Sequence, residues 1–243
     1  MSKTKGQIPP KPKTRDLILL TAKRLFNTYG VQVISANRVA DEMGISTGNL
    51  HYHFRTKNEI IYALYKEMEA KVDPILDIED GFEGDVERIG NDIQMMLSAC
   101  LEYQFFFPEI MPICMRDERI ARDYSAFQNR TVGKIAHAFR SSYVRGPLAD
   151  ATHPAYIDAL TRNIWLIITN WLNYVKIADG DPYGEVQPVD LVALMIQIFS
   201  MMRPYMSDQA QKEYEEMFPM DDELLSLIAA RFRDLPISSD TAS

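Results

Sequence analysis

The sequence predicts an all-α protein, with an N-terminal three-helix helix-turn-helix domain and a larger C-terminal helical domain. Apolar residues recur at the three- and four-residue spacing of helices, and no segment combines sustained alternation with hairpin turns. The 243-residue chain contains 13 Met but only 11 Gly, a balance that favours helix over sheet. Its 47% apolar residues can bury one large core or two modest cores.

The first helix is expected over residues 14–29. Ile18, Ala22 and Phe26 lie three or four residues apart there, and Gly30 follows as a stop signal. The preceding residues 1–13 are rich in Lys and Pro, so we expect them to form a flexible basic arm.

The next two helices form a helix-turn-helix pattern hinged at Gly44. They are expected over 35–43 and 46–54, each opened by a serine that can cap the helix. Ala40 is small enough for the two helices to cross, and Ile45 can fill the corner between them. In the second of these helices Leu50 and Phe54 are expected to be buried, which leaves small polar groups at its exposed start. Such groups can approach base edges, so the motif predicts DNA binding.

The charge distribution agrees with this interpretation. Residues 1–66 hold 11 Lys and Arg against 4 Asp and Glu, a net charge of +7. The remaining residues hold 15 against 30, a net charge of −15, and the two parts give the overall −8. A basic head attracts phosphates, whereas an acidic body repels DNA and limits wrong orientations.

A capping-box pattern at Thr56 and Glu59 opens a fourth helix that is expected to reach about Val72. This helix is long enough to leave the first domain and enter the second. We therefore expect a helix-turn-helix domain over 14–60 and a second helical domain over 61–233, which the apolar and aromatic residues described below assign to effector binding and dimerisation. Helical periodicity in the second domain predicts elements near 84–107, just after 108, 119–143, 154–178, 188–206, 207–218 and 221–233, followed by a disordered tail over 234–243.

The sequence is typical of a cytoplasmic protein. Its N-terminus lacks the apolar stretch of a signal peptide, and the longest apolar segment, 165–175, is too short to span a bilayer. Cys100 and Cys114 have no metal or redox spacing and suit a reducing compartment.

The first 70 residues resemble the DNA-binding domain of the tetracycline-repressor (TetR/AcrR) family. The segment 44–57, Gly-Ile-Ser-Thr-Gly-Asn-Leu-His-Tyr-His-Phe-Arg-Thr-Lys, is similar to the family's most characteristic stretch. Earlier residues that stand where the family has them are Ala22, Leu25-Phe26, Gly30 and Val39-Ala40. His51 departs from the pattern, because a Tyr is common at that position.

The resemblance implies that DNA contacts fall on the recognition helix and at the start of the helix before it. The residues implied to contact DNA are Ser35, Asn37, Arg38, Thr47, Gly48, Asn49, His51, Tyr52, His53 and Lys57. Two alternatives stay open: Tyr52 packs partly against its own chain, and Lys57 is simply solvated. No metal site is expected, because i,i+2 residues such as His51 and His53 do not converge on a helix.

Soft and aromatic residues gather in helices that would surround a cavity in the C-terminal domain. Such side chains can re-pack around a small, mostly apolar effector, although each taken alone is more simply explained as ordinary core. The expected ligand-binding residues are Met96, Cys100, Tyr103, Phe107, Cys114, Phe127, Trp165, Asn170, Trp171 and Tyr174. No cofactor is expected.

An apolar stripe on the expected 188–206 helix predicts a dimer interface, in which this helix and 154–178 pair with their symmetry mates. The alternative is that the stripe is buried inside one chain. Its residues are Leu191, Leu194, Met195, Ile198 and Met202.

An enzyme is not expected, because the sequence has no nucleophile-base context, no phosphate-binding Gly loop and no carboxylate-rich metal spacing. The resemblance implies a ligand-responsive transcriptional regulator. Its expected partners are a second copy of the chain, palindromic double-stranded operator DNA and a small effector that releases it, with repression as the usual outcome. The alternative is a DNA-binding activator or architectural protein that senses no small molecule.

Overall fold

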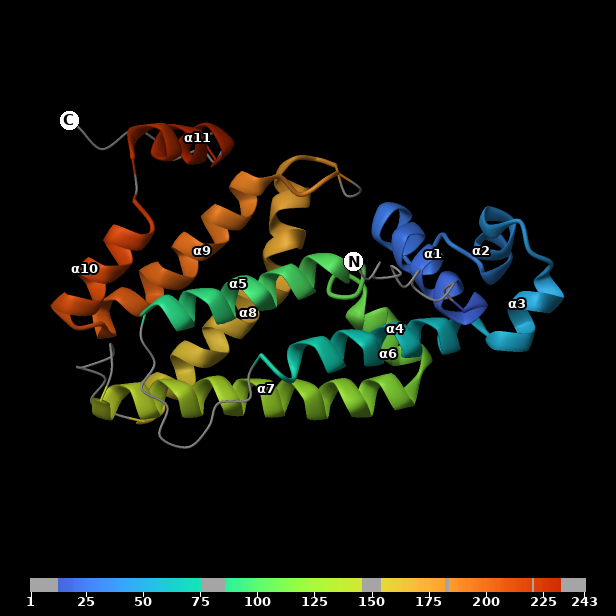
Figure 1. The fold of residues 1–243 in the computed structure, drawn as a ribbon, viewed down its shortest axis with the longest axis horizontal. Coiled ribbons are helices and arrows are strands. Elements are labelled where there is room, and N and C mark those ends of the chain that lie inside the picture. The colour runs from blue at the N-terminus through green and yellow to red at the C-terminus, as the bar shows by residue number, and fades with distance from the viewer. Residues whose placement is uncertain (1–12, 76–85, 146–153, 182–183, 220, 233–243) are drawn as a thin grey trace, which may run out of the picture.

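The computed structural model consists of helices and connecting turns wherever the chain is described (Figure 1). The expected arm, apart from Lys13, and the expected tail over 234–243 lie outside the described residues. The structure describes residues 13–75, 86–145, 154–181, 184–219 and 221–232.

Three helices form the N-terminal domain: α1 (Thr14–Tyr29), α2 (Ala36–Met43) and α3 (Thr47–His53). The Oγ atoms of Ser35 and Ser46 each accept a backbone N–H three residues later, at 3.1 Å, and so cap α2 and α3 as expected.

Helix α4 (Lys57–Val72) begins in the N-terminal domain and runs into the body, where it lies above α7 (Figure 1). Thr56 caps it by accepting the N–H of Glu59 at 3.2 Å. Leu64 and Tyr65 in its middle are fully buried. The domain boundary expected at residue 60 therefore falls inside one continuous helix.

The body contains the remaining helices, and α7 runs the length of its lower edge in Figure 1. They are α5 (Val86–Glu102), α6 (Ile110–Arg116), α7 (Glu118–Arg145), α8 (Pro154–Ala178), α9 (Pro188–Met202), a short 3-10 turn (Arg203–Tyr205), α10 (Asp208–Met217) and α11 (Asp222–Phe232).

Two helices end earlier than the sequence predicted. Helix α5 stops at Glu102, and the turn after it buries Tyr103 and the three phenylalanines at 105–107. Consecutive residues on a helix point in different directions, so a helix could not bury such a run on one side. Helix α9 gives way to the 3-10 turn at Arg203, next to Pro204, whose ring nitrogen has no N–H to donate.

The buried residues form one continuous core that joins the N-terminal domain to the body. Aromatic rings occupy its centre: Tyr65 of α4 stacks on Phe106 at 5.5 Å between centroids, and Phe127 of α7 meets Trp165 of α8 at 6.0 Å. None of the described helices is long and apolar enough to cross a membrane.

Helix α11 is held to the body by Arg231. Its Nε donates to Asp190 at 2.7 Å, and its second terminal nitrogen donates to Asp179 at 2.5 Å. The carboxylate of Asp190 is fully buried and also accepts the backbone N–H of Gln187, which opens α9. One arginine thus connects the ends of three helices, α8, α9 and α11.

Candidate nucleic-acid interface

The turn between α2 and α3 depends on Gly44. Its φ of 64° lies in the left-handed region, which glycine adopts without steric cost. The next residue, Ile45, donates its N–H to Ala40 at 3.0 Å and packs against the core, as the sequence predicted. The turn therefore fixes the angle at which α3 leaves the domain.

Helix α3 is anchored on one side and open on the other. Leu50 and Phe54 are buried in the domain, whereas Tyr52 is 85% exposed. The ring of His53, partly buried, meets the Tyr52 ring edge-on at 5.1 Å. The other exposed residues of this face are Thr47, Gly48, Asn49 and His51.

Gly48 is not required by the chain itself. A Cβ built there meets only the Oγ of Ser46, at 3.9 Å, which is ordinary van der Waals distance. Packing within the described chain therefore does not require a glycine at this exposed position.

The start of α2 presents Asn37 and Arg38 to solvent, while Ser35 is engaged as the helix cap. Arg38 forms an ion pair with Glu42 at 3.5 Å, and Arg24 of α1 binds the same carboxylate at 2.5 Å. The hydrogen bond from Arg24 lowers the pKa of Glu42, so this carboxylate stays charged.

Lys57 turns inward. Its ammonium donates to the backbone carbonyls of Val31 at 2.8 Å and Ile34 at 2.9 Å, both in the loop between α1 and α2. Burial of this group lowers the pKa of Lys57. Two of its three N–H donors are thus used inside the domain, which leaves one for the DNA contact that the resemblance implies.

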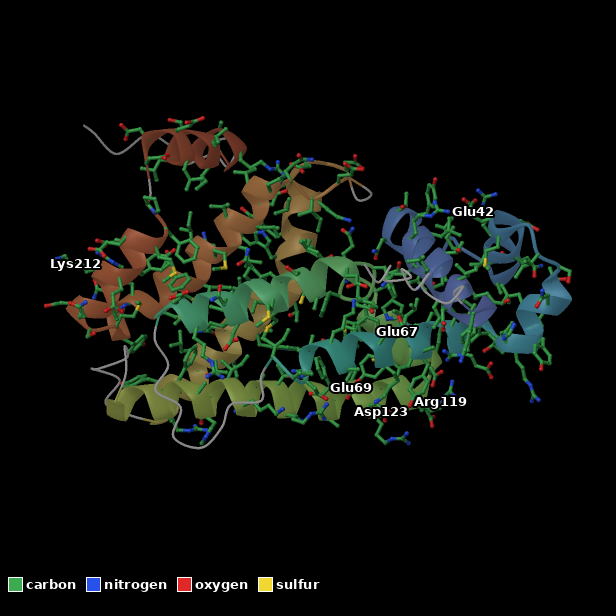
Figure 2. The ribbon with its side chains drawn as sticks, viewed as in Figure 1. Glu42, Glu67, Glu69, Arg119, Asp123 and Lys212 are labelled. Carbon is green, nitrogen blue, oxygen red and sulfur yellow. The ribbon has the colours of Figure 1, made fainter. Side chains whose placement is uncertain are left out.

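We expect Lys57→Met to destabilise the protein by about 1.5–3 kcal/mol, since it removes charge-assisted hydrogen bonds to two carbonyls while keeping the aliphatic stem. Thermal unfolding measures this effect. Lys212→Met, at an exposed position on α10 (Figure 2), is the matched control and should leave the melting temperature unchanged. If Lys57 contacts a phosphate instead, Lys57→Met should reduce the slope of log DNA affinity against log salt concentration by about one unit and leave the stability unchanged.

The body holds α4 through a polar seam with α7. Arg130 binds Glu69 at 2.8 Å and Asp73 at 3.0 Å, and the hydroxyl of Tyr62 donates to Asp123 at 2.8 Å. Figure 2 places Glu69 and Asp123 along the line where α4 and α7 meet. Arg130 is thus engaged by carboxylates in and just after α4.

A second connection, which we call the α1–α5 link, joins α1 to the end of α5. It consists of Lys23 and Asn27 of α1, Glu102 at the end of α5, and the backbone of Phe105. The Asn27 amide donates to the Glu102 carbonyl at 2.9 Å and accepts the Phe105 N–H at 3.1 Å. Lys23 forms an ion pair with the Glu102 carboxylate.

Lys71 of α4 binds the same carboxylate as Lys23. Burial alone would raise the pKa of Glu102, but the two ammonium groups outweigh it and lower that pKa. Further along the turn, the carboxylate of Glu109 accepts the N–H of Val31. The polar seam and the α1–α5 link, with the Glu109 contact beside it, therefore attach the N-terminal domain to the body.

Of the expected ligand-binding residues, Asn170, Trp171 and Tyr174 line one groove between α8 and α9. Asn170 and Tyr174 are exposed on the outer side of α8, and the Trp171 indole donates to the Asp190 carbonyl at 2.8 Å. Cys114 is partly buried. The others are buried core residues: Met96, Cys100, Tyr103, Phe107, Phe127 and Trp165.

The expected dimer stripe requires a correction. Leu194, Ile198 and Met202 are 2%, 0% and 1% exposed within a single chain, so they cannot meet a partner. Leu191 and Met195 stay partly exposed. The stripe was apolar because it faces the chain's own core.

A different apolar face is open to solvent. On α8, Leu166, Asn170 and Tyr174 follow one another at four-residue spacing, and Leu166 is 57% exposed. With Ile196 and Gln197 of α9 they line a groove of about 660 Å³, which we call the outer groove.

The two capped helices, the glycine turn and the exposed face of α3 define a helix-turn-helix DNA-binding protein. The family described as "Bacterial regulatory proteins, tetR family" matches residues 18–64, and the family described as "Bacterial transcriptional repressor" matches residues 67–214. The chain belongs to the TetR family of transcriptional regulators, as the resemblance implied, and this is a family of regulators rather than enzymes.

Among known proteins, a TetR-family transcriptional regulator from Marinobacter aquaeolei VT8 has a similar structure, with a TM-score of 0.76 and 29% identity over 90% of this chain and 99% of that one. The ketosteroid transcriptional regulator KstR2 of Mycobacterium tuberculosis shares the fold, at a TM-score of 0.54 and 14% identity, over 84% of this chain and 98% of that one.

Sequence similarity to curated relatives is more limited. A helix-turn-helix transcriptional regulator of Staphylococcus aureus strain bovine RF122 / ET3-1 is 33% identical over 86 residues, which are 35% of this chain and 46% of the relative. The match thus spans about half the length of such relatives.

Proposed function

We propose that the protein is a ligand-responsive repressor, which binds a palindromic operator as a homodimer and is released by a small, mostly apolar effector. The observation that carries this proposal is the open face of α3, with Tyr52 at its centre. This face belongs to residues 1–66, which have a net charge of +7, whereas the rest of the chain has a net charge of −15. Phosphates attract the first part and repel the second, which favours docking through α3.

The proposed dimer forms through the outer groove, in place of the buried stripe on α9. Exposed leucine and tyrosine side chains on one face of a long helix are favourable to cover, and a two-fold axis brings the same face of each chain together. Two copies of α8 and α9 then form the interface. Each recognition helix can enter a major groove, and the half-sites follow the two-fold symmetry of the protein.

Sensing is proposed to act through two attachments of the N-terminal domain. The polar seam joins α4 to α7, and the α1–α5 link joins α1 directly to Glu102. An effector that favours one arrangement of the body changes the separation of the two recognition helices. By linkage, operator DNA must weaken effector binding by the same factor as the effector weakens operator binding, typically about 5–150-fold.

Selection of fragments from the source genome tests the DNA-binding proposal. The purified protein should enrich fragments that contain an inverted repeat, with two chains bound per repeat in sedimentation. Thr47→Glu, at an exposed position of α3, is the test variant, and Thr47→Gln is its matched control. The glutamate should abolish enrichment by repelling phosphates, whereas the glutamine should retain it. Equal enrichment by both variants, or fragments without symmetry, would contradict the proposal.

A further inference from the structure

A second groove lies on the inner side of α9, between α5, α10 and α11. It has a volume of about 440 Å³. Its walls include Leu97 of α5, Leu191 and Met195 of α9, Tyr214 and Phe218 of α10, and Leu224 of α11. We call it the inner groove. None of the described residues that line it is charged, although α10 itself carries Lys212, Glu213, Glu215 and Glu216, all exposed elsewhere on the helix.

Aromatic rings hold α10 in place beside this groove. Tyr214 stacks on Phe199 of α9 at 3.8 Å between centroids, and Phe218 lies 5.2 Å from Tyr214. At Gly90, α5 and α10 approach so closely that a Cβ would lie 3.5 Å from the Phe218 ring. The helices are therefore in contact at Gly90, and the groove lies about two turns further along α5, at Leu97 and Ser98.

We propose that the inner groove binds a neutral, mostly apolar small molecule, and that this molecule is the effector; the second part rests on the proposed sensing function. The volume lies within the range of about 300–1,000 Å³ that is typical of small-molecule pockets. Met195 and Met217 supply flexible walls that adapt to a ligand's shape. A charged ligand group would be desolvated there without a countercharge, so the groove selects against carboxylates and phosphates.

A second copy of the chain fits the outer groove better than the inner one. Leu166 and Tyr174 project from the outer face into solvent, whereas the inner groove is a hollow with walls from four helices of the same chain. Ile196 lines both grooves, so a molecule in the inner groove acts on a helix that also borders the outer face.

The inner groove also has a direct route to the N-terminal domain. Ser98 lies one helical turn before Glu102, whose carboxylate and carbonyl hold Lys23 and Asn27 of α1. A ligand that shifts α5 therefore acts on α1 through the α1–α5 link, and on α4 through Lys71, which binds the same carboxylate. The region around Phe127 and Trp165 was the other candidate for a ligand site, but these two rings pack against each other in the core.

Fluorescence of the neutral dye N-phenyl-1-naphthylamine, measured on the full chain without DNA, tests the site. Ser98→Trp places a large side chain into the groove from an exposed position of α5, and Asn91→Trp, exposed on the same helix outside the groove, is the matched control. We expect Ser98→Trp to weaken dye binding at least tenfold and Asn91→Trp to leave it unchanged. Decanol should displace the dye, whereas decanoate, with the same chain and a negative charge, should not.

Equal dye binding by Ser98→Trp and the unmodified protein would overturn the site, as would equal displacement by decanol and decanoate. Gel shifts with the selected operator then test the effector role separately. If decanol occupies the groove and lowers operator affinity in the unmodified protein but not in Ser98→Trp, both parts of the proposal hold. If decanol binds and operator affinity stays constant, the site stands and its effector role is overturned.

Discussion

Glutamate in place of Leu166 is expected to separate the proposed dimer into folded monomers. Leu166 is 57% exposed in the single chain, so its replacement leaves the core intact. Across a two-fold axis, however, the change brings two carboxylates together in an apolar interface, where like charges cost several kcal/mol. Sedimentation velocity at micromolar concentration should show the dimer dissociation constant raised by roughly two orders of magnitude or more.

The matched variant is Leu194→Glu, which lies on the stripe that the sequence assigned to the interface. Leu194 is 2% exposed, so its glutamate would be buried and unpaired, and we expect a loss of about 4 kcal/mol or more in the free energy of unfolding. Circular dichroism distinguishes this outcome from dissociation. An unmodified protein that sediments as a monomer, or a dimeric Leu166→Glu variant, would show that the chains do not meet at this face.

Tyr52→Ala is expected to weaken operator binding by about 1–3 kcal/mol, the range for loss of a base contact. The side chain is 85% exposed and contacts little of its own domain, so thermal stability should not change. Tyr29→Ala is the matched control, since Tyr29 is 47% exposed on α1, away from α3. If gel-shift titrations gave the same operator affinity for Tyr52→Ala and the unmodified protein, the recognition face would be wrongly assigned.

Gly48→Ala supplies a second test of the same face, with opposite effects on stability and binding. Alanine fits the chain at this position and favours helix over glycine by roughly 0.5–1 kcal/mol, so the melting temperature should stay constant or rise. Operator affinity should nevertheless fall, because a methyl group now stands between α3 and the DNA.

Local signals predicted the N-terminal domain well. Ser35, Ser46 and Thr56 each cap the helix that the sequence assigned to them, and Gly44 adopts the left-handed conformation that the turn needs. Caps and turns involve residues within four positions of each other, so the sequence alone contains the information. The helix boundaries of the body followed from the same periodic pattern, to within a few residues in most cases.

The sequence could not distinguish a surface from a core in the body. An apolar stripe such as Leu194 and Ile198 looks the same whether it faces its own chain or another one. The same ambiguity affected Phe127 and Trp165, which pack against each other. Which neighbour covers an apolar face depends on how several helices assemble, and periodicity within one helix does not report this.

The residues that attach the N-terminal domain to the body were missed for a related reason. Asn27 donates to the carbonyl of Glu102 across 75 positions of the chain and accepts the N–H of Phe105 across 78. Asn27 and Glu102 are polar residues with nothing unusual in their local sequence. Only the packing of α1 against the turn after α5 makes Glu102 a junction between three helices.

The arginine that anchors the last helix affects how shortened forms of this protein behave. A chain that stops after α10 loses Arg231 and leaves the carboxylate of Asp190 without that cation, at the junction of α8 and α9. It also loses Leu224 and Ile228, each of which lines one of the two grooves. A regulatory defect after such a deletion would therefore combine a folding defect with altered binding sites. Point substitutions such as Arg231→Met, with stability measured in parallel, would separate the two contributions.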